Sequence, residues 1–491
     1  MRSNMHIGFA TRLILTCLWV LAVVLPVHAE WNETVLYSFQ GGNSDGAVPV
    51  GGIVFDPAGN LYGATQQGGG QCVPLGCGIV FQLTPAAQKG DPWAETVLYI
   101  FKGVTQTTTD GAFPVGGLVM DKSGNLYGTT GYGGTGDCVL LGTKVGCGTV
   151  YEMSPPAQKG GSWTETILYN FQSGKDGYLP QGDLTFDTAG NLYGATIYGG
   201  GYGVCNAPYY QYCGTIFRLR PPKAKGGKWT EKVLYSFKGG TKGKPDGDGA
   251  EPNGGLVLDS KGAIYGTTFY GGNEVGECEG GDTGTGCGTA FRLSTPVKMC
   301  SARAAHILYR FNVKDGATPA AGVILDRNGN LYGTAYAGGN QGNGGIFELL
   351  KPPGTSRIWT AKVLYLFNGA SGGAGPDAPL AFHGDGELYG TTSVGAGGEL
   401  QGSVFQLQQP HQGRGAWTIE YIHGFPGVPD GLFPSAPVVF DAIGNLYSTT
   451  RQGGTGTGCR GGCGIVFDLT PLGDQSTAFV SHLATTKRTE R

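Results

Sequence analysis

The heptapeptide GNLYGTT at residues 124–130 decides the fold, because six close copies of it occur elsewhere in the chain. They are GNLYGAT at 59–65, GNLYGAT at 190–196, GAIYGTT at 262–268, GNLYGTA at 329–335, GELYGTT at 386–392 and GNLYSTT at 444–450. A chain of this length would otherwise suggest about three domains. A motif that recurs at a regular spacing indicates instead one supersecondary unit repeated seven times.

Each unit contains four segments with strand character. In the first complete unit they cover residues 51–56, 60–65, 78–83 and 95–101, and Gly, Pro or Asp separates them. The segments are apolar on both faces, so both faces of each sheet need a neighbour. We therefore predict an all-β fold, a seven-bladed β-propeller of four-stranded antiparallel blades. An open β-solenoid is the alternative, but it needs polar capping repeats, and the first and last copies are as apolar as the others.

The ends of the repeat array predict how the ring closes. The first strand-like segment, at 33–39, has the sequence of a fourth strand, whereas the last copy, at 436–469, supplies only three strands. We expect residues 33–39 to form the outermost strand of the blade made by residues 436–469. Closure of this kind removes the free sheet edges of an open array.

The heptapeptide is interpreted as the second strand of each blade. The preceding Asp-x-x-Gly-Asn, residues 121–125 in the second copy, is expected to be the turn from the innermost strand. The Leu and Tyr of the motif are expected to pack between blades. The Gly after the Tyr is expected to admit a neighbouring backbone.

The N-terminus resembles a secretory signal at residues 1–29, with Arg2 and Arg12, an apolar run and the small-residue site VHA at 27–29. Residues 30–470 are then the propeller domain and 471–491 a polar tail. Removal of the two arginines changes the formal charge from −3 to −5, which argues against a nucleic-acid partner. The mature chain has no apolar segment of membrane-spanning length. We expect a secreted protein, extracellular, on the cell surface or periplasmic, and monomeric.

The repeat also resembles a known family. The pattern [EW]-T-x-L-Y-x-F, D-G-A-x-P, GG-L-x-x-D-x-x-GN-LYGTT, G-T-V-F-x-L over residues 33–470 is similar to the GloVer (Gloeo/Verruco) tandem repeat of secreted bacterial proteins. The resemblance implies a β-propeller-like protein outside the cell and implies no activity. Many such proteins end in an anchoring segment, whereas this chain ends in a polar tail.

Ten cysteines form close pairs between the second and third strands of five copies. In a secreted chain this pattern predicts one disulfide in each of five loops. Zinc would need four converging ligands, and these pairs belong to separate blades, so no metal site is predicted from them. The predicted pairs are Cys72/Cys77, Cys138/Cys147, Cys205/Cys213, Cys278/Cys287 and Cys459/Cys463, and Cys300 is left over.

A recurring Asp-Gly-x-x-Pro segment precedes the first strand of each copy. Asp-Gly opens turns by bonding its own backbone, which favours a structural role. A ring of carboxylates near a channel would also suit Ca²⁺ or acid–base work, so calcium stays an alternative to a protein without cofactors. The residues are Asp45, Asp110, Asp176, Asp248, Asp315 and Asp430, with Asp377 assigned to a shortened version.

Departures from the repeat suggest a binding site. Tyr132, Tyr198 and Tyr270 occupy one equivalent position in three consecutive copies, where the other copies have Gln67, Ala337, Val394 and Gln452. The loop of the third copy adds Tyr202, Tyr209 and Tyr210. Tyrosine suits stacking on sugars or protein contacts, so these six tyrosines are the predicted ligand-binding residues. The alternative is that the rings only cover loop backbone.

The sequence contains no nucleophile elbow, P-loop or HExxH motif, and its histidines form no ligand pattern. His423 replaces the Tyr of a fourth strand and is interpreted as a packing substitute. The favoured function is a non-catalytic scaffold that binds a glycan or a surface protein. The alternatives are a propeller enzyme acting on polysaccharide, as a lyase or hydrolase, and a purely structural surface protein. An enzyme would place two or more unique acid or base groups at the channel mouth.

Overall fold

Each copy of the heptapeptide forms the second strand of a four-stranded antiparallel sheet in the computed structural model. The structure describes residues 31–472 except 71, 73–75, 89–90, 159, 202–212, 225, 240–246, 273–277, 279–285, 295–304, 355, 357, 370–371, 385, 396–399 and 411–414. The second strands, which number blades 1 to 7, are β3 (Leu61–Gly68), β8 (Leu126–Gly133), β14 (Leu192–Tyr198), β18 (Ile264–Thr268), β22 (Leu331–Ala335), β26 (Glu387–Thr392) and β31 (Leu446–Gly453).

The other three strands of each blade follow from the inside of the ring outward. The innermost strands are β2 (Gly46–Phe55), β6 (Gly111–Pro114) with β7 (Val119–Met120), β13 (Tyr178–Phe186), β17 (Val257–Leu258), β21 (Ile324–Leu325), β25 (Ala381–His383) and β29 (Gly431–Pro434) with β30 (Val439–Phe440). The third strands are β4 (Ile79–Thr84), β11 (Thr149–Ser154), β15 (Thr215–Arg220), β19 (Thr289–Leu293), β23 (Gly345–Leu350), β27 (Ser403–Gln408) and β32 (Ile465–Pro471). The outermost are β5 (Ala94–Ile100), β12 (Thr164–Asn170), β16 (Thr230–Ser236), β20 (Ala305–Arg310), β24 (Thr360–Leu366), β28 (Thr418–Gly424) and β1 (Trp31–Ser38).

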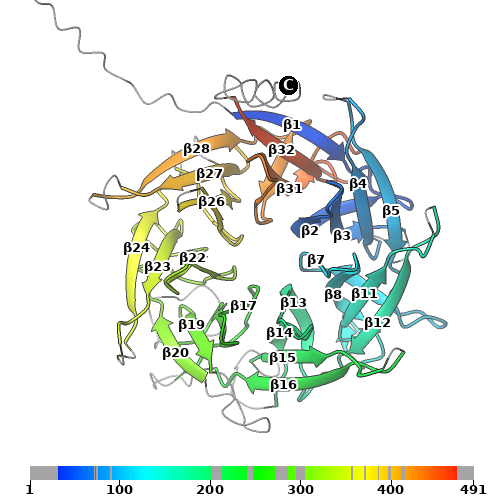
Figure 1. Ribbon diagram of the computed structural model, residues 1–491, viewed down its shortest axis with the longest axis horizontal. Helices are drawn as coiled ribbons and strands as arrows, with labels where there is room; N and C mark the ends of the chain where they lie inside the picture. Colours follow the sequence, from blue (N-terminus) through cyan, green and yellow to red (C-terminus); the bar gives the residue numbers. More distant parts are fainter. Residues whose placement is uncertain are drawn as a thin grey trace, which may run out of the picture. The chain divides into compact units, whose positions relative to one another are not determined.

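The seven sheets stand around a central channel, with β2, β7, β13 and β17 facing it and β5, β12 and β16 at the rim (Figure 1). The described part of the chain contains no helix. The predicted seven-bladed propeller is therefore confirmed.

Ring closure also follows the prediction. β1 pairs antiparallel with β32, and its register runs from Trp31 opposite Pro471 to Ser38 opposite Ile465. The last blade thus takes its outer strand from the beginning of the chain (Figure 1). Closure leaves β32 with a partner on both sides.

The Asp-x-x-Gly-Asn segment forms the predicted turn between the first two strands. In blade 2 the Asp121 carboxylate accepts hydrogen bonds from the amides of Ser123 and Asn125, at 2.8 and 2.9 Å. Its other oxygen accepts from the Asn125 side chain at 2.8 Å and from the Tyr127 hydroxyl at 3.2 Å. The turn therefore holds the tyrosine of the heptapeptide by its polar end.

The glycine after this tyrosine has a different role from the one expected. A Cβ atom on Gly63 would lie 2.6 Å from Cζ of Phe81, and one on Gly128 would lie 2.4 Å from the hydroxyl of Tyr151. Both aromatic residues lie directly opposite the glycines on the third strand of the same blade. The glycine therefore makes room for a cross-strand aromatic ring and not for a neighbouring backbone.

The tyrosine ring joins one blade to the next. Tyr127 of blade 2 is 5% exposed. Its ring centroid lies 5.2 Å from Phe186 and 6.1 Å from Trp229, both of blade 3. Equivalent contacts join Tyr62 to Trp163, Tyr265 to Trp359, Tyr332 to Phe382, Tyr389 to Phe440 and Trp31, and Tyr447 to Phe55 and Trp93.

A second aromatic layer joins every neighbouring pair of blades. The aromatic residue that follows each outer strand contacts the third-strand aromatic residue of the next blade, with ring centroids 4.8 to 5.6 Å apart. The pairs are Phe39–Phe81, Phe101–Tyr151, Phe171–Phe217, Phe237–Phe291, Phe311–Phe347, Phe367–Phe405 and Phe425–Phe467.

A backbone hydrogen bond accompanies each of these junctions. The residue between Ala and Pro in Asp-Gly-Ala-x-Pro has a positive φ, for example 57° at Val48 and 57° at Phe113. Its amide donates to a carbonyl just before the third strand of the preceding blade: Val48 to Cys463 at 2.8 Å, and Phe113 to Cys77 at 2.9 Å. A left-handed conformation at a bulky residue is costly, and the contact between blades compensates it.

The disulfide loops hold these acceptor carbonyls. Cys72–Cys77, Cys138–Cys147, Cys278–Cys287 and Cys459–Cys463 are bonded as predicted. Cys213 is also disulfide-bonded, while Cys205 and Cys300 lie outside the described residues. The second cysteine of each described bridge provides the acceptor carbonyl, so the bridge stabilises the blade junction as well as the loop.

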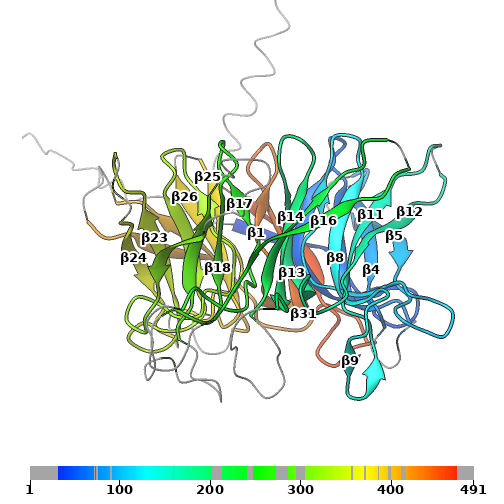
Figure 2. The same cartoon turned by 90° about the horizontal axis from the view of Figure 1, so that it is seen from below.

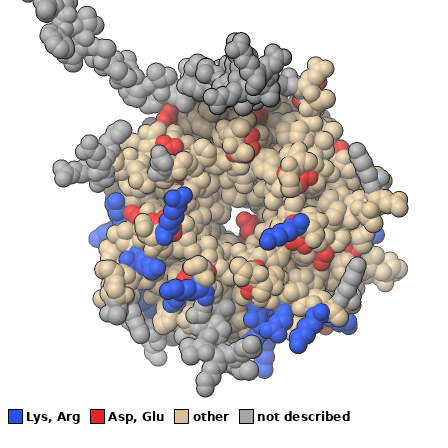
Figure 3. Space-filling view, viewed as in Figure 1, with Lys and Arg blue, Asp and Glu red and all other residues tan. Residues whose placement is uncertain are grey.

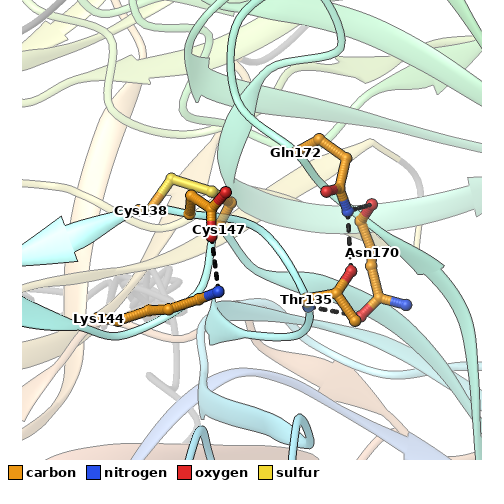
Figure 4. A network of polar contacts seen from close by, with 7 residues as sticks. Thr135, Cys138, Lys144, Cys147, Asn170 and Gln172 are labelled. Carbon is orange, nitrogen blue, oxygen red and sulfur yellow. Dashed lines mark hydrogen bonds and ion pairs between the residues drawn. A yellow bond between two sulfur atoms is a disulfide. The ribbon is translucent and has the colours of Figure 1, made fainter.

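The loop of blade 2 shows how the rest of such a loop is held (Figure 4). Its hairpin of β9 (Val139–Leu140) and β10 (Thr143–Lys144) is tied by an ion pair between Lys144 and Asp137 at 2.6 Å. The Thr135 amide donates to the Asn170 side chain at 3.1 Å, and the Gln172 side chain donates to the Thr135 hydroxyl at 2.9 Å. The loop is thus attached to the outer strand of its own blade.

Removal of residues 31–38 tests the closure directly. The deletion removes the ladder to β32 and the buried side chain of Leu36. We expect it to lower the free energy of unfolding by about 5 kcal/mol or more, because a lost core leucine alone costs roughly 2–5 kcal/mol. Thermal melting followed by circular dichroism measures the change. An unchanged melting temperature would show that β1 does not close the ring.

Candidate functional site

The channel mouth lies on the face that carries the disulfide loops, from which β9 projects in Figure 2. Three positions of the repeat line it: the residue before the Pro of Asp-Gly-x-x-Pro, the residue after that Pro, and the two residues after the heptapeptide. All seven residues that follow the proline line the channel: Val50, Val115, Gln181, Asn253, Ala320, Asp377 and Ser435. Residues that are identical in all copies serve the fold, so the residues that differ among blades are the candidates for a binding site.

Glycines in or just before the innermost strands line the channel, for example Gly51, Gly182 and Gly254. A Cβ atom on Gly51 would lie 2.1 Å from the amide nitrogen of Gly117 in blade 2, so the approach of these blades requires glycine. Asp183 of blade 3 replaces one of these glycines. Its carboxylate accepts a hydrogen bond from the Gly117 amide at 2.5 Å, which lowers its pKa, while burial raises that pKa by more. The hole remains open through the ring (Figure 3).

The mouth opens into a cavity of about 950 Å³ over blades 5, 6, 7 and 1. Tyr336, Asp377, Arg451 and Gln66 line both this cavity and the channel below it. Tyr336 is 44% exposed. The combination of an exposed aromatic ring, a carboxylate, a guanidinium and an amide at one opening suits recognition of a polar ligand.

Asp377 corrects the sequence alignment of the sixth copy. It follows Pro376 and so occupies the position of Val50 and Gln181, not that of the Asp-Gly turn. Burial raises the pKa of Asp377 to about 6, and the nearby charge of Arg451 acts in the opposite direction. Its Oδ1 is buried and accepts no hydrogen bond from the described residues.

A second unpartnered atom occupies the same position two blades away. Asn253 of blade 4 lines the channel, and its Oδ1 is buried without a hydrogen-bond partner among the described residues. Buried polar atoms of this kind normally bond to protein, water or ligand. Asp377 and Asn253 therefore offer two acceptors toward the inside of the channel.

Three of the six predicted tyrosines, Tyr132, Tyr198 and Tyr270, lie at the ends of the second strands of blades 2, 3 and 4. Each is partly exposed and contacts another aromatic ring: Tyr132 with Phe113 at 5.8 Å, Tyr198 with Tyr178 at 5.2 Å, and Tyr270 with Phe269 at 4.7 Å. The structure thus places the three in neighbouring blades. Tyr202, Tyr209 and Tyr210 lie outside the described residues.

The Asp-Gly carboxylates do not form a ring around the channel. Asp45 is 8% exposed and lies at a blade junction, where it accepts hydrogen bonds from the amides of Gln40 and Gly46, each at 2.6 Å, and from the Tyr37 hydroxyl at 3.1 Å. Asp110 makes the same three contacts, with Tyr99 at 2.9 Å. Asp45 and Asp110 thus tie their turns to the preceding outer strand through amide and hydroxyl donors.

Four glutamates of the outer strands face these buried aspartates. Burial, followed by the charge of the neighbouring aspartate, raises the pKa of Glu95 and Glu231 to about 7 and that of Glu33 and Glu165 to about 8. In each of the four, Oε1 is buried without a partner in the described structure. These carboxyl groups are protonated more readily in the folded protein than in the unfolded chain.

Sequence reasoning missed the polar half of the mouth. The sequence does contain a signal for it, because the residue after the proline varies among the seven copies: Val, Val, Gln, Asn, Ala, Asp and Ser. The assignment of Asp377 to the Asp-Gly turn conceals this variation. The second missed feature is that His423 lies near two carboxylates and not only among apolar residues: its Nε2 is 3.5 Å from Asp430.

Comparisons with known proteins identify the family. The Gloeobacter/Verrucomicrobia repeat family matches residues 25–207 and 276–490, and the chain belongs to this family. No curated protein matches the sequence significantly. A solved structure from Thermus thermophilus, provisionally described as an oxidoreductase (glucose dehydrogenase), is similar at 17% identity and a TM-score of 0.36, over 72% of this chain and 95% of that one. No helix in the described residues is long and apolar enough to cross a bilayer.

The glutamate set predicts an unusual dependence of stability on pH. The folded-state pKa values of Glu95, Glu165 and Glu231 exceed the ordinary value of 4.5, so their contribution is complete below pH 4.5 and is lost as the pH rises through 7 to 8. Replacing all three by Gln should stabilise the protein at pH 8 by roughly 1–2 kcal/mol per site, once screening by solvent is allowed for, and change little at pH 4.5. Melting of both proteins across this range measures the effect. Parallel pH profiles would contradict it.

Proposed function

We propose that this protein is a secreted scaffold that binds a glycan at the channel mouth without turning it over. The observation that carries the proposal is Asp377, whose buried Oδ1 lacks a partner in the described structure while Arg451 and Tyr336 line the same cavity. Sugar hydroxyls donate to a carboxylate and accept from a guanidinium, and an aromatic ring covers the apolar face of a pyranose. The disulfides support a location outside the cytoplasm.

The tyrosines of blades 2 to 4 extend this proposal across the mouth. A polar half over blades 5 to 1 and an aromatic half over blades 2 to 4 suit a ligand longer than one sugar ring. In that arrangement Asp377 and Arg451 fix one residue of an oligosaccharide, and Tyr132, Tyr198 and Tyr270 provide stacking surfaces for others. The alternative ligand for such a scaffold is a surface protein that presents polar and aromatic groups.

One observation favours the enzyme alternative. Two carboxylates without counterparts in the other blades, Asp183 and Asp377, line the channel, and burial raises the pKa of Asp377 to about 6. A carboxylic acid of that pKa suits general-acid catalysis in polysaccharide cleavage. Mass spectrometry of the bound glycan distinguishes the two functions: an intact ligand supports a binder, and shorter products support a hydrolase or lyase.

The test begins with a glycan array probed with the purified protein. For the oligosaccharide that binds, we expect Asp377→Asn and Arg451→Gln each to weaken the affinity by about 2 kcal/mol, or roughly 30-fold. Arg327→Gln is the matched control, because Arg327 is exposed and lines a different cavity. It should bind like the parent protein.

A second set of variants tests the aromatic half. The triple replacement of Tyr132, Tyr198 and Tyr270 by Ala should weaken the binding of long oligosaccharides more than the binding of short ones. Melting temperatures establish that the variants fold. If folded Asp377→Asn and Arg451→Gln variants bind as the parent does, the polar mouth is not the binding site. If the array shows no ligand, screening for surface-protein partners decides between the scaffold and the purely structural interpretation.

A further inference from the structure

The junction between blades 6 and 7 differs in one residue from the three junctions that precede blades 1, 2 and 3. At the junctions that precede blades 1, 2 and 3, a tyrosine comes from the outer strand of one blade. It faces two residues of the next blade, the aspartate of the Asp-Gly turn and a glutamate of the outer strand. The tyrosine donates to the aspartate at 3.1, 2.9 and 2.9 Å in turn. At the junction entering blade 7 the tyrosine position holds His423, facing Asp430 and Glu33.

These three side chains come from three separate segments. His423 lies on β28, Asp430 directly before β29, and Glu33 on the closing strand β1. All three are partly buried, and the side chains of His423 and Asp430 are each 18% exposed. One ligand atom of each residue lies within 4.8 Å of the others. The cluster therefore joins the two ends of the repeat array at one point.

The distance between His423 and Asp430 is longer than the Tyr–Asp hydrogen bonds at the other junctions. Nε2 of His423 is 3.5 Å from Oδ2 of Asp430, is buried, and has no hydrogen-bond partner in the described structure. Oε1 of Glu33 is also buried without a partner, while the Glu33 carboxyl group lies within hydrogen-bonding reach of Asp430. Two ligands of a tetrahedral ion with bonds of about 2.1 Å lie about 3.4 Å apart, so the His–Asp distance of 3.5 Å matches one edge of such a site.

We propose that Glu33, His423 and Asp430 form a site for a divalent transition metal ion, with Zn²⁺ as the best match. One imidazole and two carboxylates are ligands that Zn²⁺ accepts, and a water molecule is able to complete the tetrahedron. The cation neutralises two adjacent buried carboxylates. Because Glu33 belongs to β1, the bound ion attaches the closing strand to blades 6 and 7 and stabilises the closed ring.

The experiment is a calorimetric titration of the purified, untagged, chelator-treated protein with Zn²⁺. We expect one tight equivalent and a melting temperature that rises with Zn²⁺ concentration. His423→Tyr is the matched variant, because it restores the residue of the other junctions and removes the imidazole. It should retain the fold and bind Zn²⁺ at least tenfold more weakly. Glu33→Gln, which keeps the shape of the side chain, should do the same.

Replacing Zn²⁺ by Co²⁺ identifies the ligand set, because tetrahedral Co²⁺ absorbs visible light. With nitrogen and oxygen ligands alone, we expect this visible absorption and no thiolate charge-transfer band. A thiolate band would place the metal on a cysteine and overturn the proposal. So would the absence of a stoichiometric equivalent in the parent protein, or equal affinities of the parent and both folded variants.

Discussion

The tyrosine of each heptapeptide is the contact on which the ring depends. In five blades its hydroxyl donates to the aspartate of the preceding turn, as Tyr127 does to Asp121, and in blades 5 and 6 it donates to a glutamate of the same blade. The ring of Tyr127 lies against aromatic residues of the next blade, as do most of the others. One residue thus fixes a hairpin within a blade and the packing between two blades. Because a ring of seven sheets is stable only if every junction is filled, the motif has to recur in every copy, and this explains why the chain repeats it so faithfully.

The same requirement separates structure from recognition. Positions that make junctions are nearly invariant in residue type, as are the glycine beneath the third-strand ring and the aspartate of the Asp-Gly turn, or in backbone conformation, as is the residue of positive φ before the proline. Positions that face the channel contact no neighbouring blade in this repeated way, so they are free to differ. Asp377, Arg451, Tyr336 and Asn253 are such differences, and they gather at one opening. The repeated residues therefore build the propeller, and a few side chains that are not repeated determine the chemical properties of the channel mouth.

Repetition also explains how much the sequence could predict. Blade number, strand order, closure by residues 33–39 and the described disulfides follow from spacing and local pattern, because each was supported by several copies. Features that rest on a single copy were harder. The prediction places Asp377 in a shortened Asp-Gly turn, whereas Asp377 follows Pro376. It treats His423 as a packing residue, whereas two carboxylates from remote segments lie close to it. The role of the heptapeptide glycine depends on a cross-strand ring that no sequence spacing reveals.

Hydrogen–deuterium exchange of the intact protein tests the central claim that β1 closes the ring. Amides in a paired strand exchange slowly, because exchange requires that the ladder open. The account predicts that peptides covering Trp31–Ser38 exchange as slowly as those covering the other outer strands, β5 and β12. Rapid exchange over Trp31–Ser38, with β5 and β12 still protected, would show that the N-terminal strand is not part of the last blade and would contradict the closed seven-bladed ring.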